Sequence, residues 1–265
     1  MQFKKLFAPV AVSAALAFAS LSSAVSAETI KIGVTPVPHA DVVNFIKPIL
    51  AKEGVDLKVI EFNDYVQPNL ALDSKDLDAN YFQTIPYFEE FCRQHKLNFE
   101  NLVSVHLEPM GLYSKKVKNV ADIKKGDRIA IPNDPTNEGR ALLVLEHAGL
   151  IKLAKGFKLI DGLSGVVENP LNLKFVELEP ALLPRALDDV KASIINANYA
   201  LQAGFNPAKD AIALEAKSSP FGNIVAVRKG DAQKEAFQKL KKAITSPEVK
   251  KFIEDKYQGG VIPTF

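Results

Sequence analysis

Residues 132–140 combine residue types and a spacing that suit the binding of an anion. Residues 127–131 before them form a short run typical of a strand, and the apolar residues after them recur at helical spacing until Gly149. Asp134 followed by Pro135 predicts the start of that helix, with an acceptor at the cap and proline at the first helical position. We therefore expect a strand-to-helix turn, whose free backbone N–H groups form a ready anion site.

Arg140 follows Asn137 by three residues, so both side chains are expected on one face of this helix. A cation near a helix start is unfavourable unless an anion lies beside it. Two interpretations stay open for this position. Either Arg140 binds the carboxylate of a ligand, or it forms a salt bridge with Asp134 or Glu138.

Further polar and aromatic residues fall where other strands are expected to end. His39 and His106 lie at such ends or crossings, although a structural histidine is an equal alternative for each. The aromatic residues are more often core than pocket, but each falls near an amide or carboxyl side chain, and such a pocket suits a small zwitterion. The aromatic residues are Tyr65, Tyr81, Phe82 and Tyr113, and their polar neighbours are Asn63, Asn80 and Glu108.

Motifs of catalysis are missing from the sequence. It contains no Gly-x-Ser-x-Gly, no phosphate-binding loop and no zinc-spaced His/Glu pair. Cys92 and His95 are close in sequence, but both are expected in a helix, where a core or edge position is favoured over a catalytic dyad. We therefore predict no catalytic residue, no metal site and no cofactor.

The elements that must position these residues alternate between strand and helix. Alternation at this spacing predicts a mostly parallel sheet, with ligands beyond the carboxyl ends of its strands. Residues 102–113 and 223–228 are longer extended runs, which we interpret as crossings between two lobes. The predicted α/β fold thus has lobe 1 at residues 28–113 plus 224–265 and lobe 2 at residues 114–223, with the ligand cleft between them.

The N-terminus and the charge balance limit location and partners. Residues 1–27 have the charged start, the apolar run and the small residues Val25, Ser26 and Ala27 of a cleavable signal peptide. No cysteine follows this cleavage site, so we expect a protein free in the periplasm without a lipid anchor. Without Lys4 and Lys5, the 33 basic residues become 31, against 31 acidic ones, which argues against nucleic acid as a partner.

Several stretches resemble the NlpA/MetQ family, the methionine-binding receptors of bacterial ABC importers. The likeness covers nearly all of the chain after the signal peptide and is specific. The matching stretches are residues 62–69, 76–83, 108–116, 130–140, 167–170, 183–185, 207–210 and 219–220.

This resemblance implies a two-lobed periplasmic-binding-protein fold, type II-like, with two crossing strands. It implies that Arg140 takes the ligand carboxylate and that Asn196 and Asn223 bind the polar end. It places Tyr65 and Phe82 at the thioether. The other ligand-binding residues that it suggests are Asn137, His106 and Glu108. His39, Tyr81 and Tyr113 are further candidates because of their places near the expected strand ends and cleft.

The function that the resemblance implies is a receptor that delivers L- or D-methionine to an ABC importer and performs no chemistry of its own. Its partners would be that ligand, the permease and its ATPase, and the receptor itself would be a monomer. A receptor for another amino acid or a methionine-containing dipeptide is the alternative within the class. A periplasmic hydrolase is the alternative from another class, which the missing nucleophile–base pair argues against.

Overall fold

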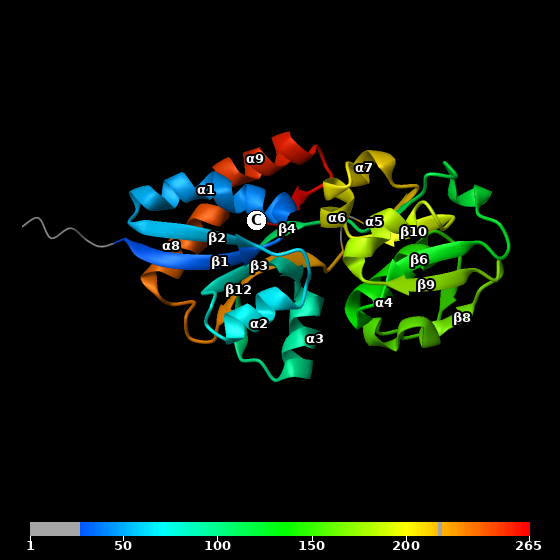
Figure 1. Ribbon diagram of the computed structural model, residues 1–265, viewed down its shortest axis with the longest axis horizontal. Helices are drawn as coiled ribbons and strands as arrows, with labels where there is room; N and C mark the ends of the chain where they lie inside the picture. The colour runs from blue at the N-terminus through cyan, green and yellow to red at the C-terminus, as the bar shows by residue number, and fades with distance from the viewer. Residues whose placement is uncertain (1–26, 217–218) are drawn as a thin grey trace, which may run out of the picture.

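The computed structural model describes residues 27–216 and 219–265, which form two α/β lobes side by side (Figure 1). The expected signal peptide lies, except for Ala27, outside these described residues. Within the described residues, no helix is long and apolar enough to cross a membrane. Each lobe is built around its own sheet, and the chain passes between the lobes near residues 108–110 and again before residue 222.

The first lobe contains a six-stranded sheet in the order β13-β4-β12-β3-β1-β2. Strand β1 is parallel to β2 and β3, whereas β12 is antiparallel to β3 and β4, and β13 is antiparallel to β4. All six residues of β3 are buried, as expected at the centre of a sheet covered on both faces. The strands are β1 (Glu28–Val34), β2 (Val55–Glu61), β3 (Ala79–Thr84), β4 (Phe99–Leu107), β12 (Gly222–Arg228) and β13 (Ile262–Pro263).

Helices cover both faces of this sheet (Figure 1). Helices α1, α8 and α9 pack on one face, where α8 buries Ala236, Phe237, Leu240, Ala243 and Ile244 at helical spacing. Helices α2 and α3 pack on the other face. The elements are η1 (Pro36–Ala40), α1 (Asp41–Lys52), α2 (Gln67–Asp73), α3 (Ile85–His95), α8 (Glu235–Ile244) and α9 (Pro247–Tyr257).

The second lobe contains a five-stranded sheet in the order β11-β5-β10-β6-β9. Strand β10 is parallel to β6 and β6 is parallel to β9, whereas β5 is antiparallel to both β10 and β11. The strands are β5 (Gly111–Tyr113), β6 (Arg128–Pro132), β9 (Lys174–Leu178), β10 (Ala192–Ile195) and β11 (Ala213–Leu214), with a separate pair β7 (Lys152–Leu153) and β8 (Val166–Glu168).

Helix α4 (Pro135–His147) dominates the helical part of this lobe, and its apolar face packs on the sheet. Asp134 caps it by accepting a hydrogen bond from the backbone N–H of Asn137, and Pro135 is its first residue, as predicted. The other helical elements are η2 (Val120–Asp122), η3 (Leu159–Gly165), η4 (Pro180–Leu182), α5 (Leu183–Ala186), α6 (Ala197–Gln202) and α7 (Pro207–Asp210).

The topology corrects two expectations from the sequence. The sheets are mixed rather than mostly parallel, because the strands that return from the other lobe enter in the opposite direction. The first crossing falls before β5 and not after Tyr113, since β5 pairs with strands of the second lobe.

Candidate ligand-binding site

A cleft lies where the two lobes meet. The first lobe lines it from β3, α3 and β12 and from the loop after β2. The second lobe lines it from α4 and from the junction of β10 with α6, and Glu108 lines it from the crossing segment. The lining residues are Tyr65, Phe82, Gln83, Thr84, Tyr87, Glu108, Asn137, Arg140, Asn196, Ala197, Asn198 and Asn223.

The buried guanidinium of Arg140 pairs with Glu215, a carboxylate that neither sequence interpretation named. Its Nε donates to Glu215 Oε1 at 2.9 Å, and its Nη2 donates to Glu215 Oε2 at 2.6 Å and to the Glu108 carbonyl at 2.6 Å. The group also lies 4.4 Å above the ring of Phe221. Among the described residues, Nη1 has no hydrogen-bond partner, so this nitrogen can serve a ligand in the cleft.

The two carboxylates expected near Arg140 have other roles. Asp134 caps α4, and its two oxygens accept from the side-chain amide of Asn137 at 3.0 Å. Burial raises the pKa of the Asp134 carboxyl, and the hydrogen bonds from Asn137 oppose that rise. Glu138 accepts from the backbone N–H of Leu163 at 2.8 Å. Arg140 is therefore held by the Glu215 carboxylate and the Glu108 carbonyl, and not by a carboxylate of its own helix.

A chain of hydrogen bonds fixes the polarity of Asn196. Asp134 accepts from the backbone N–H and from the side-chain Nδ2 of Asn137, so Asn137 turns its Nδ2 toward Asp134 and its Oδ1 toward Asn196. Asn196 in turn donates its Nδ2 to that oxygen at 2.9 Å. Asn196 Oδ1 is consequently left as a buried acceptor, and it makes no hydrogen bond within the described residues. A ligand donor such as an ammonium group would satisfy it.

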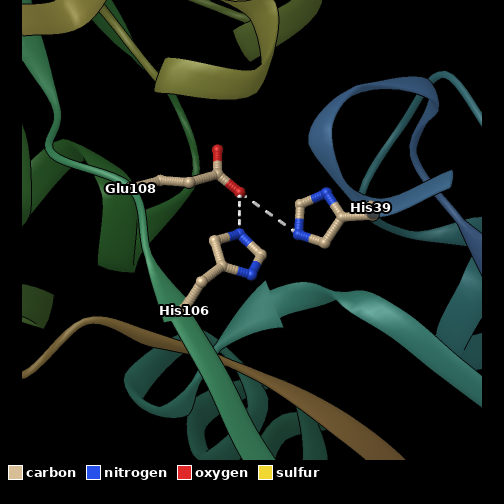
Figure 2. A group of neighbouring side chains, drawn as sticks. All are labelled: His39, His106 and Glu108. Atoms are coloured by element: carbon tan, nitrogen blue, oxygen red, sulfur yellow. Dashed lines mark hydrogen bonds and ion pairs between the residues drawn. The ribbon is translucent and has the colours of Figure 1, made fainter. Parts of the chain in front are cut away.

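Behind the cleft, His39 and His106 converge on Glu108 (Figure 2). Glu108 Oε1 lies 3.2 Å from His39 Nε2 and 2.7 Å from His106 Nε2. The Nδ1 atoms pair with hydroxyl groups, His39 with Thr35 at 2.7 Å and His106 with Tyr81. The hydroxyls can donate to both Nδ1 atoms, so each neutral imidazole can donate its Nε2–H to the carboxylate.

Burial governs the protonation of this cluster. It lowers the pKa of His39 to about 4, although the charge of Glu108 opposes the shift, and it lowers the pKa of His106 to about 3. Burial also raises the pKa of Glu108. The three donor atoms lie within 4.8 Å of one another, as metal ligands would, but hydrogen bonds inside the cluster already account for each of them.

Aromatic rings form the apolar wall of the cleft. Tyr65 and Phe82 have ring centroids 6.0 Å apart, and Tyr87 contacts both rings at 5.9 and 6.1 Å. The Tyr87 hydroxyl donates to the carbonyl of Tyr65 at 2.8 Å, which ties the loop after β2 to α3. These rings, supplied by separate segments, leave an apolar surface on one side of the cleft.

The structure brings seven of the predicted ligand-binding residues to the cleft wall: Tyr65, Phe82, Glu108, Asn137, Arg140, Asn196 and Asn223. His106 does not line the cleft, because it lies behind Glu108 and pairs with Tyr81. His39 and Tyr81 belong to the same buried cluster. Tyr113 is buried in the core of the second lobe against Phe205.

The predicted ligand-binding residues did not include Gln83, Thr84, Tyr87, Ala197 and Asn198, which also line the cleft. The available signal was Asn196-Ala197-Asn198 directly after a buried strand, where the second asparagine deserved equal weight. Asn198 is buried, it lines the cleft, and its Nδ2 makes no hydrogen bond within the described residues. Nothing in the spacing marks Tyr87, since one face of α3 is apolar throughout its first turns.

Two mixed sheets joined by crossing segments, with a cleft lined from both lobes, define the class of two-lobed substrate-binding proteins. The chain belongs to the NlpA lipoprotein family, whose model matches residues 30–265. It is 40% identical over 239 residues to the methionine-binding lipoprotein MetQ of Bacillus subtilis, covering 88% of this chain and 87% of that protein. It is 42% identical over 213 residues to the D-methionine-binding lipoprotein MetQ of Escherichia coli, covering 80% and 79%.

Solved structures agree with this assignment. A nutrient-binding protein from Burkholderia cenocepacia bound to methionine is 46% identical, with a TM-score of 0.86 over 89% of this chain and all of that one. A periplasmic substrate-binding protein of an ABC transporter from Coxiella burnetii is 37% identical, with a TM-score of 0.85 over 89% of this chain and all of that one. The predicted family and two-lobed fold are confirmed.

The family assignment corrects one prediction, that of a protein without a lipid anchor. The matching family is one of lipoproteins, and the relatives from Bacillus subtilis and Escherichia coli are named lipoproteins. The prediction was wrong because it rested on an absence, that of a cysteine after Ala27. The sequence has a single cysteine, Cys92, which lies half-buried in α3.

Proposed function

We propose that this protein is the substrate-binding component of an ABC importer and that its ligand is methionine. The observation that carries the proposal is the cleft itself, which joins an aromatic wall to a set of buried polar groups. Its mixed polar and apolar lining suits a small zwitterion with an apolar side chain. The names of the Bacillus subtilis and Escherichia coli relatives and the methionine bound to the Burkholderia cenocepacia protein support this ligand.

Each part of the ligand has a complementary part of the cleft. Arg140 Nη1 would donate to the carboxylate, while Glu215 holds the guanidinium in place through its other edge. Asn196 Oδ1 would accept from the ammonium group. The thioether would lie against Tyr65, Phe82 and Tyr87, where sulfur–aromatic contacts are favourable.

The protein performs no chemistry on this ligand. Since residues of both lobes line the cleft, a ligand that touches both stabilises the closed arrangement by its differential affinity for that state. The closed receptor would then dock on the permease, whose ATPase drives transport. We infer that a single receptor chain, with no second copy contributing to the cleft, is the binding unit.

Mass spectrometry of the small molecules released by denaturing the purified protein tests this function. The expected result is methionine, and titration calorimetry of the stripped protein should then show binding of methionine. Another amino acid or a dipeptide in the released fraction, with weak binding of methionine, would replace the ligand assignment. No bound amino acid and no binding of methionine would overturn the proposed function.

A further inference from the structure

Asn198 presents a buried hydrogen-bond donor to the cleft. The residue lies at the start of α6, is 3% exposed and lines the cleft. Its Nδ2 has no partner among the described residues. A buried amide donor without a partner is costly, so such a group in a binding cleft points to a ligand acceptor.

Tyr65 sets the orientation of the Asn198 amide. The Tyr65 hydroxyl donates to Asn198 Oδ1 at 2.6 Å, and burial raises the pKa of Tyr65 well above its ordinary value, so the hydroxyl keeps its proton. With Oδ1 engaged as the acceptor, Nδ2 must point the other way. The ring of Tyr65 is itself packed between Phe82, Tyr87 and Tyr199.

This hydrogen bond joins the two lobes. Tyr65 belongs to the loop after β2 in the first lobe, and Asn198 belongs to α6, which follows β10 in the second. A second bond of the same kind joins Tyr199 in α6 to the carbonyl of Asn63 at 2.9 Å. The orientation of the Asn198 amide therefore depends on contact between the lobes.

We propose that Asn198 is a ligand-binding residue whose Nδ2 donates to the carboxylate of the bound amino acid, and that Tyr65 is the positioning residue that aims it. Asn196 Oδ1, two residues earlier, is an unpaired acceptor, so the same turn offers one acceptor and one donor. The ammonium and carboxylate groups of an α-amino acid are attached to one carbon and match that pair. Because Glu215 already neutralises Arg140, a neutral second donor fits the carboxylate without adding buried charge.

This inference rests on the proposed function and names an atom of the same site. Titration calorimetry with methionine and with methioninol, which lacks the carboxylate, tests it. The ratio of the two affinities measures recognition of the carboxylate. Asn198→Leu removes the donor at nearly constant volume and should lower methionine affinity by about 10- to 100-fold, the range of a hydrogen bond to a charged group. Methioninol affinity should fall far less, so the ratio should shrink.

A matched pair of tyrosine variants separates the orientation of the Asn198 amide from the contact between the two lobes. Tyr65→Phe and Tyr199→Phe each remove one hydroxyl bond between the lobes, but only Tyr65 contacts the Asn198 amide. Tyr65→Phe should shrink the ratio, by several-fold, whereas Tyr199→Phe should weaken both ligands equally and preserve it. Thermal melts of the ligand-free proteins show whether each variant is folded.

The outcomes distinguish this inference from the proposed function. If the wild type binds methionine and Asn198→Leu or Tyr65→Phe keeps the wild-type ratio in a folded protein, the inference is overturned and the function stands. If the wild type does not bind methionine, the proposed function fails first. If Asn198→Leu does not fold, the ratio in Tyr65→Phe against Tyr199→Phe decides the matter.

Discussion

At the scale of single residues, the cleft owes its polarity to groups that do not all touch the ligand. Asp134 accepts from the side-chain amide of Asn137, which sets the orientation of Asn137 and then of Asn196. Glu215 similarly occupies the Nε and Nη2 edge of Arg140 and leaves Nη1 to the cleft. A carboxylate outside the cleft thus decides, in each case, which atom of its neighbour faces the ligand.

Substitution of Asn137 should expose this dependence. Asn137→Leu leaves Asn196 Nδ2 without its partner, so the amide is free to turn and its acceptor is no longer aimed at the ammonium. We expect weaker methionine binding by about 1–3 kcal/mol, the cost of an unsatisfied buried group. Calorimetry with methionine and its des-amino analogue should show the loss mainly for methionine. Thr136→Val, which removes only the 3.2 Å bond to Asp134, serves as the control. If Asn137→Leu weakened the binding of both ligands equally, the dependence of the Asn196 amide on Asn137 would be contradicted.

The paired guanidinium of Arg140 predicts two effects for Arg140→Lys. A lysine cannot reproduce the bidentate pair with Glu215, so the melting temperature of the ligand-free protein should fall. Methionine binding should also weaken, by roughly 1.5–3 kcal/mol, because a hydrogen bond to a charged group is lost. Calorimetry with methionine and methionine amide, alongside melts, measures both effects.

Glu215→Gln is the control for Arg140→Lys, since it disturbs the pair but keeps the guanidinium. It should lower the melting temperature and retain the preference for acid over amide. If that preference survives in Arg140→Lys as well, Arg140 does not bind the ligand carboxylate.

At the scale of elements, the aromatic wall is assembled where three segments meet. The loop after β2 supplies Tyr65, the end of β3 supplies Phe82, and the first turn of α3 supplies Tyr87. Phe91, one turn further along α3, packs on Tyr87 at 5.8 Å but does not line the cleft. The wall is therefore continuous with a small core behind it. A substitution in the wall should change ligand affinity, whereas a substitution in the core should change the stability of the protein.

Phe82→Ala should weaken methionine binding more than alanine binding, by about 1–3 kcal/mol, because only methionine has a side chain long enough to bury against the ring. Phe91→Ala should instead lower the melting temperature while changing the affinities for the two amino acids alike. Calorimetry of both ligands on both variants is the measurement. Equal losses for methionine and alanine in Phe82→Ala would assign Phe82 to the core.

At the scale of the whole molecule, the cluster of His39, His106 and Glu108 links the crossing segment to the first lobe and should make stability depend on pH. The folded protein holds both histidines neutral, with pKa values lowered to about 4 and about 3. Between pH 6.5 and those values the unfolded chain binds more protons, so stability falls as the pH falls. The raised pKa of Glu108 acts in the opposite direction above pH 4.5, but the two histidines outnumber it.

Thermal melts between pH 7 and pH 4 should therefore show a steady loss of stability. His39 alone would contribute on the order of 3 kcal/mol at the lower end of this window. His39→Gln should flatten the profile, whereas His147→Gln, at an exposed position outside the cluster, should not change its slope. A His39→Gln profile as steep as that of the wild type would contradict this assignment.

The sequence by itself determined the local elements around the cleft. The cap at Asp134, the proline after it and the apolar spacing predicted α4 nearly to the residue, because these signals act within one turn of helix. Family motifs pointed to seven of the residues that line the cleft. Such information is local, or it is carried by resemblance.

Only the tertiary structure decided which partners those residues have. Glu215 lies 75 residues from Arg140 in sequence, and Asn198 lies 133 residues from Tyr65, so no spacing rule connects either pair. The mixed sheets arise in the same way, since the direction of a crossing strand depends on how the lobes pack. Hydrogen-bond partners far apart in the chain are set by the fold as a whole, and local sequence patterns carry no record of them.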